Sequence, residues 1–185
     1  MAAREIFVPL TVGGGIRSVD DIVAALRSGA DKVAINTAVI QRPLLIEEAS
    51  RALGSQCIVV SIEAKGRSPG TWEALTDNGR QRTGLDVVDW AARAQELGAG
   101  EILLTSVDKE GTRAGFDLAL LAAVRKRVRI PVICSGGAGR PEHVVDAIGE
   151  GTSDAIACAS LFHYAVCPIP RLKSHLVEHG LIVRT

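Results

Sequence analysis

The 185-residue sequence predicts an α/β fold of about six repeated βα units around a parallel sheet. Short runs rich in valine and isoleucine recur along the chain, and most lack alternation of apolar and polar residues. That pattern is typical of strands buried on both faces. Segments with helical spacing separate these runs, and a glycine follows most of them. Strands that alternate with helices in this way favour a parallel barrel or a doubly wound sheet.

The predicted elements fill a single domain, residues 1–185, without a linker. The predicted strands are Ile6–Val12, Lys32–Asn36, Cys57–Glu63, Glu101–Ser106, Pro131–Ser135 and Asp154–Ala159. The predicted helices are Val19–Ser28, Pro43–Leu53, Leu85–Leu97, Asp117–Val128, Glu142–Glu150 and Arg171–His179. The long loop after Glu63 contains Asp77-Asn78-Gly79, which is a hairpin turn signal. A long structured loop after a strand usually serves a functional site.

An internal repeat refines the fold class. When the chain is shifted by about 122 positions, Gly14-Gly15 falls on Gly136-Gly137 and Gly29 falls on Gly151. The same module of strand, glycine pair, helix and glycine therefore occurs twice. Repeated βα modules favour the barrel, and we expect an incomplete (β/α)8 barrel of the TIM type.

The composition limits the classes of binding partner to expect. The formal net charge is zero and the isoelectric point is about 6.9, so nothing predicts binding to nucleic acid or to a membrane. Small molecules are the expected partners. The four cysteines have no metal-ligand spacing, and their place in apolar runs fits a reducing, cytoplasmic location. We therefore expect no metal.

Glycine clusters at two predicted strand ends indicate phosphate binding. Gly13-Gly14-Gly15 and Gly136-Gly137 each lie between a strand and a helix, where backbone amides can approach an anion. Asn36-Thr37 and Ala159-Ser160 end the strands that follow, and their polar groups could complete each cradle. Two alternatives remain open: the glycines could serve tight turns, and the polar residues could cap helices. Two equivalent clusters predict a ligand with a phosphate at each end.

Glu63 is the candidate catalytic residue. It ends a predicted apolar strand, which is where barrel enzymes hold their catalytic groups, and burial would raise its pKa toward acid–base use. The alternative is a structural ion pair with the nearby Lys65. After the next strand come Thr105, Ser106, Asp108 and Glu110-Gly111-Thr112, which add polar groups to the same edge of the sheet.

Several motifs together resemble one family. These are TVGGGIRS, GADKVAINT, GSQCIVVSIEAK, GAGEILLTSVDKEGTRAGFD, PVICSGGAG and HGLIVR. They occur over nearly the whole chain in the order and spacing of the cyclase subunit of imidazole glycerol phosphate synthase. The resemblance implies a (β/α)8 barrel without a cofactor. It also implies a bis-phosphorylated ribulosyl aminoimidazole carboxamide nucleotide as substrate, ammonia from a glutaminase partner, and imidazole glycerol phosphate and aminoimidazole carboxamide ribonucleotide as products.

The resemblance also implies roles for individual residues. One phosphate site would be Gly15, Asn36 and Thr37, and the other would be Gly111, Gly137, Ala159 and Ser160. Thr105 and Ser135 match polar residues that line the family's site. Lys32 and Glu101 match two members of a charged gate at the ammonia entrance, and Asp31 matches a position that faces the glutaminase.

The sequence departs from this family in three ways. It begins at what looks like the family's third strand, so the first-strand catalytic aspartate has no counterpart. Glu63 stands where the family has its other catalytic aspartate, and Glu110 stands where a second loop has one. Since a displacement of about 1 Å can cost on the order of 100-fold in rate, we expect impaired catalysis.

An incomplete barrel would have two free sheet edges, which are an aggregation hazard unless covered. We therefore expect self-association through strands Ile6–Val12 and Asp154–Ala159. Two alternatives to a cyclase stay open. One is a phosphate-binding or assembly module without catalysis, and the other is the sister phosphoribosyl isomerase of histidine biosynthesis, which shares the fold, the repeat and two phosphate sites.

Overall fold

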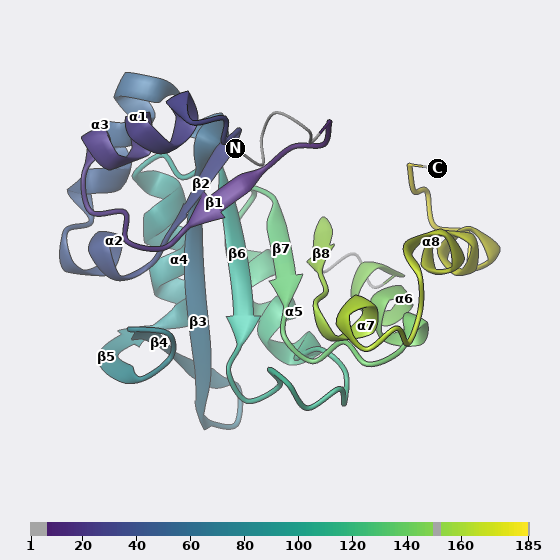
Figure 1. The fold of residues 1–185 in the computed structure, drawn as a ribbon. Coiled ribbons are helices and arrows are strands. Elements are labelled where there is room, and N and C mark those ends of the chain that lie inside the picture. The colour runs from purple at the N-terminus through teal and green to yellow at the C-terminus, as the bar shows by residue number, and fades with distance from the viewer. Residues whose placement is uncertain (1–6, 150–152, 185) are drawn as a thin grey trace.

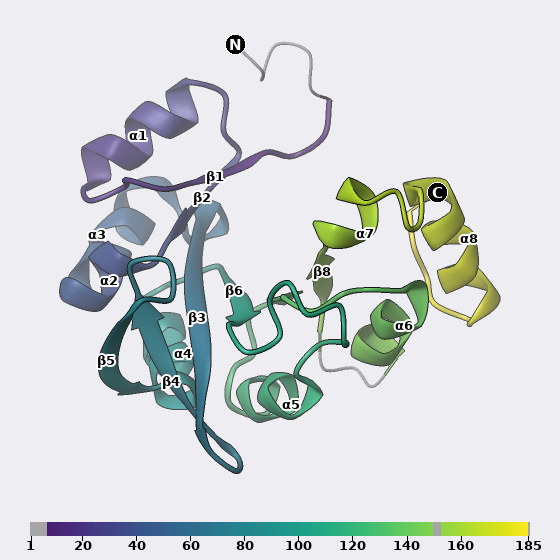
Figure 2. The ribbon, with the colours of Figure 1, turned by 60° about the horizontal axis from the view of Figure 1, so that its bottom comes forward.

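The chain forms an incomplete parallel barrel, as predicted. The computed structural model describes residues 7–149 and 153–184. Figure 1 shows the parallel strands side by side, and Figure 2 shows that they follow an open arc with most helices on its outer side. The sheet order is β1-β2-β3-β6-β7-β8, with strands Thr11–Gly13, Lys32–Ile35, Ile58–Ser68, Glu101–Ser106, Val132–Ser135 and Ala155–Ala157.

The helices follow the predicted alternation, with shifted ends and two additions. The short helices α2 and α7 begin directly after β2 and β8, and sequence analysis did not predict them. The predicted helix Leu85–Leu97 begins two residues later because Leu85 and Asp86 belong to a strand. The helices are α1 Val19–Arg27, α2 Thr37–Gln41, α3 Leu44–Leu53, α4 Val87–Glu96, α5 Leu118–Arg127, α6 Pro141–Gly149, α7 Ser160–His163 and α8 Ile169–Glu178, and a short 3-10 turn spans Ser55–Cys57.

The strands also differ in detail from the prediction. The first strand is Thr11–Gly13 instead of Ile6–Val12, and Ile6 lies outside the described residues. The last strand is shorter than Asp154–Ala159, covering Ala155–Ala157. The predicted helix near Glu142–Glu150 is α6, and Glu150 also lies outside the described residues. The order of the elements is nevertheless the predicted one.

Burial on both strand faces, expected from the apolar runs, is wrong for the ends of several strands. In β6 the buried residues Ile102, Leu104 and Ser106 alternate with the half-buried Glu101 and Thr105. The buried residues face the core between the sheet and the helices. The half-buried residues lie on the concave face of the sheet. That face keeps partial exposure because the arc is open, so polar side chains can occupy it.

The loop after Glu63 is a β-hairpin, as its turn signal predicted. Strand β4, Thr71–Thr76, pairs antiparallel with both β3 and β5, Gln81–Asp86. Because this pairing extends β3 to Ser68, Glu63 lies in the middle of a strand and not at its end. In the parallel part of the sheet, Glu63 is still paired with Thr105, which precedes the last residue of β6.

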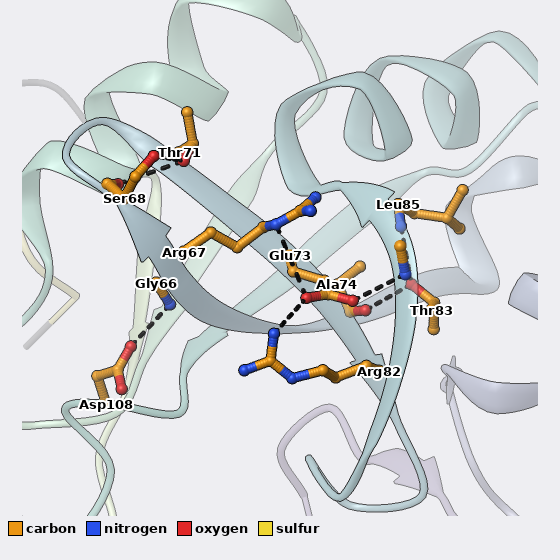
Figure 3. Close-up of polar contacts among 11 residues, drawn as sticks. Gly66, Arg67, Ser68, Thr71, Glu73, Ala74, Arg82, Thr83, Leu85 and Asp108 are labelled. Carbon is orange, nitrogen blue, oxygen red and sulfur yellow. Dashed lines mark hydrogen bonds and ion pairs between the residues drawn. The ribbon is translucent and has the colours of Figure 1, made fainter.

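A buried carboxylate fixes the base of the hairpin. Glu73 in β4 is 3% exposed and lies between two arginines that point toward it from either side (Figure 3). Its Oε2 is 3.2 Å from Arg82 and 3.9 Å from Arg67, and its Oε1 accepts a hydrogen bond from the Gly84 amide at 2.8 Å. These contacts join β3, β4 and β5 to one another, so they hold the hairpin together at its base.

Candidate functional site

A cleft of about 980 Å³ opens at the carboxyl ends of β1, β2 and β3. It brings together four residues that sequence analysis selected separately: Gly15, Asn36, Thr37 and Glu63. The rest of its wall comes from the concave face and the hairpin turn, including Ser61. Ligands of parallel α/β folds bind at this edge of the sheet, so the cleft is the candidate site.

The glycine loop after β1 is open to the cleft. Gly14 and Gly15 have φ values of 101° and 72°, and a Cβ at either position would meet no atom within 4 Å. The amides of Gly15 and Ile16 have no acceptor in the described part of the chain. Small residues with free amides leave room for an anion to approach the backbone.

A capping box of Ser18 and Asp21 begins helix α1. The Asp21 carboxylate accepts hydrogen bonds from the amides of Arg17 at 2.9 Å and Ser18 at 3.0 Å, and the Ser18 hydroxyl accepts from the Asp21 amide. These bonds hold the pKa of Asp21 below its ordinary value. The amides of Arg17, Ser18 and Asp21 are therefore already paired, whereas those of Gly15 and Ile16 are not.

Asn36 does not cap helix α2, which was the alternative reading of its position. Its side-chain amide donates instead to Glu63 Oε2 and to the Leu75 carbonyl, both at 3.0 Å. The amides of Thr37 and Ala38 consequently have no acceptor among the residues described. These two amides add donors to the wall that already holds the free amides of the glycine loop.

The hairpin turn contacts the candidate catalytic carboxylate directly. The Gly79 amide donates to Glu63 Oε2 at 2.6 Å, and the Asp77 amide donates to the Thr37 hydroxyl at 3.2 Å. Asp77, Asn78 and Gly79 have φ values of 52°, 55° and 75°, a left-handed run that turns their amides back toward β2 and β3. The turn has a signal in the sequence, whereas its contact with Glu63 arises only from the folding of the hairpin onto β3.

The environment of Glu63 favours its protonated form. Burial raises the pKa of Glu63 above its ordinary value, while the Gly79 amide and the Asn36 side chain act in the opposite direction and the Asp77 charge raises it further. The proposed ion pair with Lys65 is wrong, because Lys65 pairs with Asp108. Glu63 thus has no cationic partner in the described structure.

Two arginines line the cleft that sequence analysis did not select. Arg17 follows the glycine loop and forms no ion pair with a described residue, whereas Arg42 follows α2 and is 3.1 Å from Glu48. Each guanidinium can supply charge to a bound phosphate. Nothing in the sequence around these two arginines indicates a binding role, because arginines near helix ends are usually solvated.

The second predicted phosphate cluster lies at the far end of the arc. Gly137 is buried, and a Cβ there would be 2.2 Å from the Gly115 carbonyl, so this glycine is required for loop packing. Gly111, Ala159 and Ser160 lie around the same loops, and Ser160 begins α7 without a side-chain cap. The structure therefore places the two clusters at separate ends of the sheet.

Polar residues connect these ends across the concave face. The register pairs Glu63 with Thr105 and Thr105 with Ser135, so the three occupy one row of the sheet. Glu110 is exposed, and its Oε2 lies near Gly136, 3.2 Å from where a Cβ would be. A ligand spanning the two clusters would pass over this row.

The predicted gate residues meet at the amino-terminal edge of the same face. Lys32 Nζ forms an ion pair with Glu101, and both side chains are partly exposed. Asp31, expected to face a glutaminase, is exposed and accepts a hydrogen bond from the Leu10 amide at 2.7 Å. That bond ties the segment before β1 to β2, which is a structural role for Asp31.

The described residues provide little beyond this cleft for other ligand classes. Within residues 7–149 and 153–184, no three His, Cys, Asp or Glu side chains come together as metal ligands. Over the same residues, no helix has the length and apolar character needed to span a membrane. The four cysteines are free thiols, and burial raises the pKa of Cys134 to about 12.

The parallel half-barrel places the chain among α/β proteins of the (β/α)8 type, with its cleft at the carboxyl edge of the sheet. A comparison with protein families identifies which members of that class are related. A family model described as histidine biosynthesis protein matches residues 1–168. The chain belongs to this histidine biosynthesis family.

Proposed function

We propose that the chain binds a bis-phosphorylated nucleotide intermediate of histidine biosynthesis and carries out cyclase chemistry on it, with Glu63 as the acid–base group. The observation that carries the proposal is the cleft itself. It combines free amides at Gly15 and Thr37 with the partly buried carboxylate of Glu63. The motifs NT after β2, LLTS in β6 and SGGAG after β7 favour the cyclase over the sister isomerase.

In this proposal each part of the cleft has one task. The amides after β1 and at the start of α2 bind one phosphate, and Arg17 supplies charge to it. Thr105 and Ser135 contact the middle of the ligand, and the loops at Gly111 and Ser160 receive its other end. Glu63 exchanges protons as ammonia is incorporated and the imidazole ring closes, a step in which general acid–base catalysis contributes on the order of 10²–10⁴-fold.

A second candidate function is a binding module without catalysis. It is favoured by the two hydrogen bonds that Glu63 Oε2 already accepts from Gly79 and Asn36. A carboxylate oxygen used in this way holds the hairpin in place. In that case Glu63 would be a structural acceptor, and the cleft would bind phosphate without turnover.

Turnover with ammonium chloride as the ammonia source separates these functions. The assay measures imidazole glycerol phosphate formation by the wild type, by Glu63→Gln, and by the surface control Glu96→Gln, whose side chain is 62% exposed. The cyclase proposal predicts measurable wild-type turnover, at least a ~100-fold loss in Glu63→Gln and no loss in the control.

Two results would contradict it. Equal rates in the wild type and in Glu63→Gln would remove Glu63 from the chemistry. Absence of turnover together with saturable binding of the nucleotide would favour the binding module. Conversion of the aminoaldose form of the nucleotide to its ketose would instead identify the isomerase.

A further inference from the structure

Gly111 is the open glycine of the second cluster. Its φ is 74°, and a Cβ there would meet no atom within 4 Å, as at Gly15 in the first cluster. The Gly111 amide has no acceptor among the described residues. Gly136 and Gly137 are buried instead, and a Cβ on either would lie within 3 Å of a backbone oxygen. An anion at this end of the sheet can therefore approach the backbone at Gly111.

A short turn after β6 presents Gly111. The amides of Lys109 and Glu110 donate to the Ser106 carbonyl at 3.2 and 2.9 Å, and the Thr112 amide donates to the Lys109 carbonyl at 3.0 Å. These bonds shape the turn from within. They do not attach it to the neighbouring strand, so its position over the sheet depends on other contacts.

Asp108 attaches this turn to β3. The parallel ladder between β3 and β6 ends at the pair Ala64 and Ser106. One step beyond it, Asp108 Oδ2 accepts a hydrogen bond from the Gly66 amide at 2.8 Å (Figure 3), and Oδ1 pairs with Lys65 Nζ. The Lys65 contact, together with the Gly66 amide, holds the pKa of Asp108 below its ordinary value.

The bond to Gly66 is the stronger of these two restraints. The side chains of Lys65 and Asp108 are 39% and 40% exposed, and an ion pair so exposed to solvent contributes little. The Gly66 amide belongs to the backbone of a strand, so it cannot move away as a lysine side chain can. A carboxylate that accepts from such an amide makes a strong and directional bond.

We propose that Asp108 is a positioning residue, which holds the turn so that the Gly111 amide meets a phosphate group of the ligand. This inference rests on the proposed function, in which the loop at Gly111 receives one end of the ligand. A turn that is already ordered does not lose conformational freedom when the phosphate binds, so the affinity is higher.

The same contacts place this turn and Glu63 in one frame. Gly66 lies three residues after Glu63 in β3. Val107, next to Asp108, packs against the hairpin turn, since its Cγ2 is 3.3 Å from where a Cβ on Gly79 would be. The Gly79 amide in turn donates to Glu63. Asp108 therefore links the phosphate donor of one end to the acid–base group of the other.

Two substitutions separate positioning from a simple effect of charge. Asp108→Asn and Asp108→Ala remove the same negative charge, but only asparagine keeps an oxygen that can accept from the Gly66 amide. If the charge alone mattered, both variants would bind phosphate equally and more tightly than the wild type. If position matters, only the alanine variant binds more weakly.

The test is a titration of the folded chain with inorganic phosphate, followed by the NMR signals of the Gly15 and Gly111 amides. We expect Asp108→Ala to bind at least ~10-fold more weakly at Gly111 and with unchanged affinity at Gly15. Asp108→Asn should stay within about 3-fold of the wild type at both, because it keeps the bond to Gly66.

Asp154→Ala is the matched control. The Asp154 carboxylate also accepts from one backbone amide, that of Val132 at 2.9 Å, and pairs with one cation, Arg125 at 3.3 Å. Its side chain is 38% exposed, close to the value for Asp108, but it lies at the amino-terminal edge of the sheet. This variant should leave the affinity at Gly15 and at Gly111 unchanged.

Several outcomes would overturn the inference. Wild-type affinity at Gly111 in Asp108→Ala would do so, as would equal weakening in Asp108→Asn or in the control. Equal weakening at Gly15 and Gly111 would show a general loss of structure instead of positioning. If Asp108→Ala does not fold, Asp108→Ser replaces it with the same expectation, because its hydroxyl ends one bond short of the carboxylate oxygens. Absence of wild-type binding at Gly111 would remove the second phosphate site of the proposed function along with this role, whereas the other outcomes contradict the role of Asp108 alone.

Discussion

Replacing Asn36 with aspartate places a second carboxyl group against Glu63. In the wild type, both hydrogens of the Asn36 amide are used, one on Glu63 Oε2 and one on the Leu75 carbonyl, each at 3.0 Å. Aspartate has nearly the same shape but no donor when ionised. The substitution therefore converts two favourable contacts into repulsion at the point where β2, β3 and the hairpin meet.

The size of the effect follows from these contacts. Two unit charges ~4 Å apart at an effective dielectric constant of ~20 repel by about 4 kcal/mol. Each lost hydrogen bond adds about 1 kcal/mol to the loss of stability. Protonation of one of the two carboxyl groups removes the repulsion, so it limits the total loss. We expect a loss of about 3 kcal/mol in the free energy of unfolding at pH 8.

The loss of stability in Asn36→Asp increases as the pH rises. The pKa of Glu63 is already raised in the folded state, and a neighbouring aspartate raises it further. A carboxyl group whose pKa is higher in the folded state contributes stability that is fully present below its unfolded-state pKa of about 4.3. That stability is lost as the pH rises through the folded-state pKa. Asn36→Asp should therefore lose only about 1 kcal/mol at pH 4, where one carboxyl hydrogen replaces one of the two amide hydrogens, and about 3 kcal/mol at pH 8.

Urea unfolding followed by fluorescence of the buried Trp72 and Trp90 measures this difference. Gln41→Glu is the control, because it adds one charge to an exposed position of the same cleft. The control should change the free energy of unfolding by less than about 0.5 kcal/mol. A difference below that value for Asn36→Asp at pH 8, or a loss equal at pH 4 and pH 8, would refute the reasoning.

Three further predictions concern single side chains. Glu63→Gln should flatten the wild-type fall in stability as pH rises from about 4 to 7, because it removes the group whose pKa is raised by burial; an unchanged profile would show that Glu63 does not cause it. Gly137→Ala should cost roughly 3 kcal/mol or more in thermal unfolding, since its Cβ would be 2.2 Å from a carbonyl, whereas Gly14→Ala should cost only about 1 kcal/mol of backbone strain. Similar losses at the two glycines would contradict this. Glu73→Ala should cost about 2 kcal/mol in urea unfolding, because the Gly84 amide loses its acceptor while the two exposed arginines remain solvated; a neutral effect would remove Glu73 from the hairpin's support.

Local pattern was sufficient to predict the order of strands and helices. The run at Cys57–Glu63 and the run at Glu101–Ser106 pair as neighbours in the sheet, and the first predicted helix begins at Val19 as expected. These features depend on residues close in sequence. Burial of both strand faces could not be judged, because it depends on whether the arc closes.

The contacts that define the cleft needed the folded structure. Asn36 and Glu63 are 27 residues apart, and Gly79 is 16 residues from Glu63. Both polar groups had plausible local partners, a helix end for Asn36 and Lys65 for Glu63. In the folded chain, the packing of the hairpin gives Asn36 and Glu63 different partners. A local sequence pattern could not predict these partners.

The most direct test of the account is a calorimetric titration with the bis-phosphorylated nucleotide, which compares the wild type with Thr37→Val. Valine keeps the shape of threonine but removes the hydroxyl, which accepts from the Asp77 amide and in this proposal donates its own hydrogen to the phosphate in the cleft. The account predicts saturable binding by the wild type and at least ~10-fold weaker binding by the variant, about 1.4 kcal/mol. Absence of wild-type binding at millimolar nucleotide, or equal affinities for the two proteins, would contradict phosphate binding at this cleft.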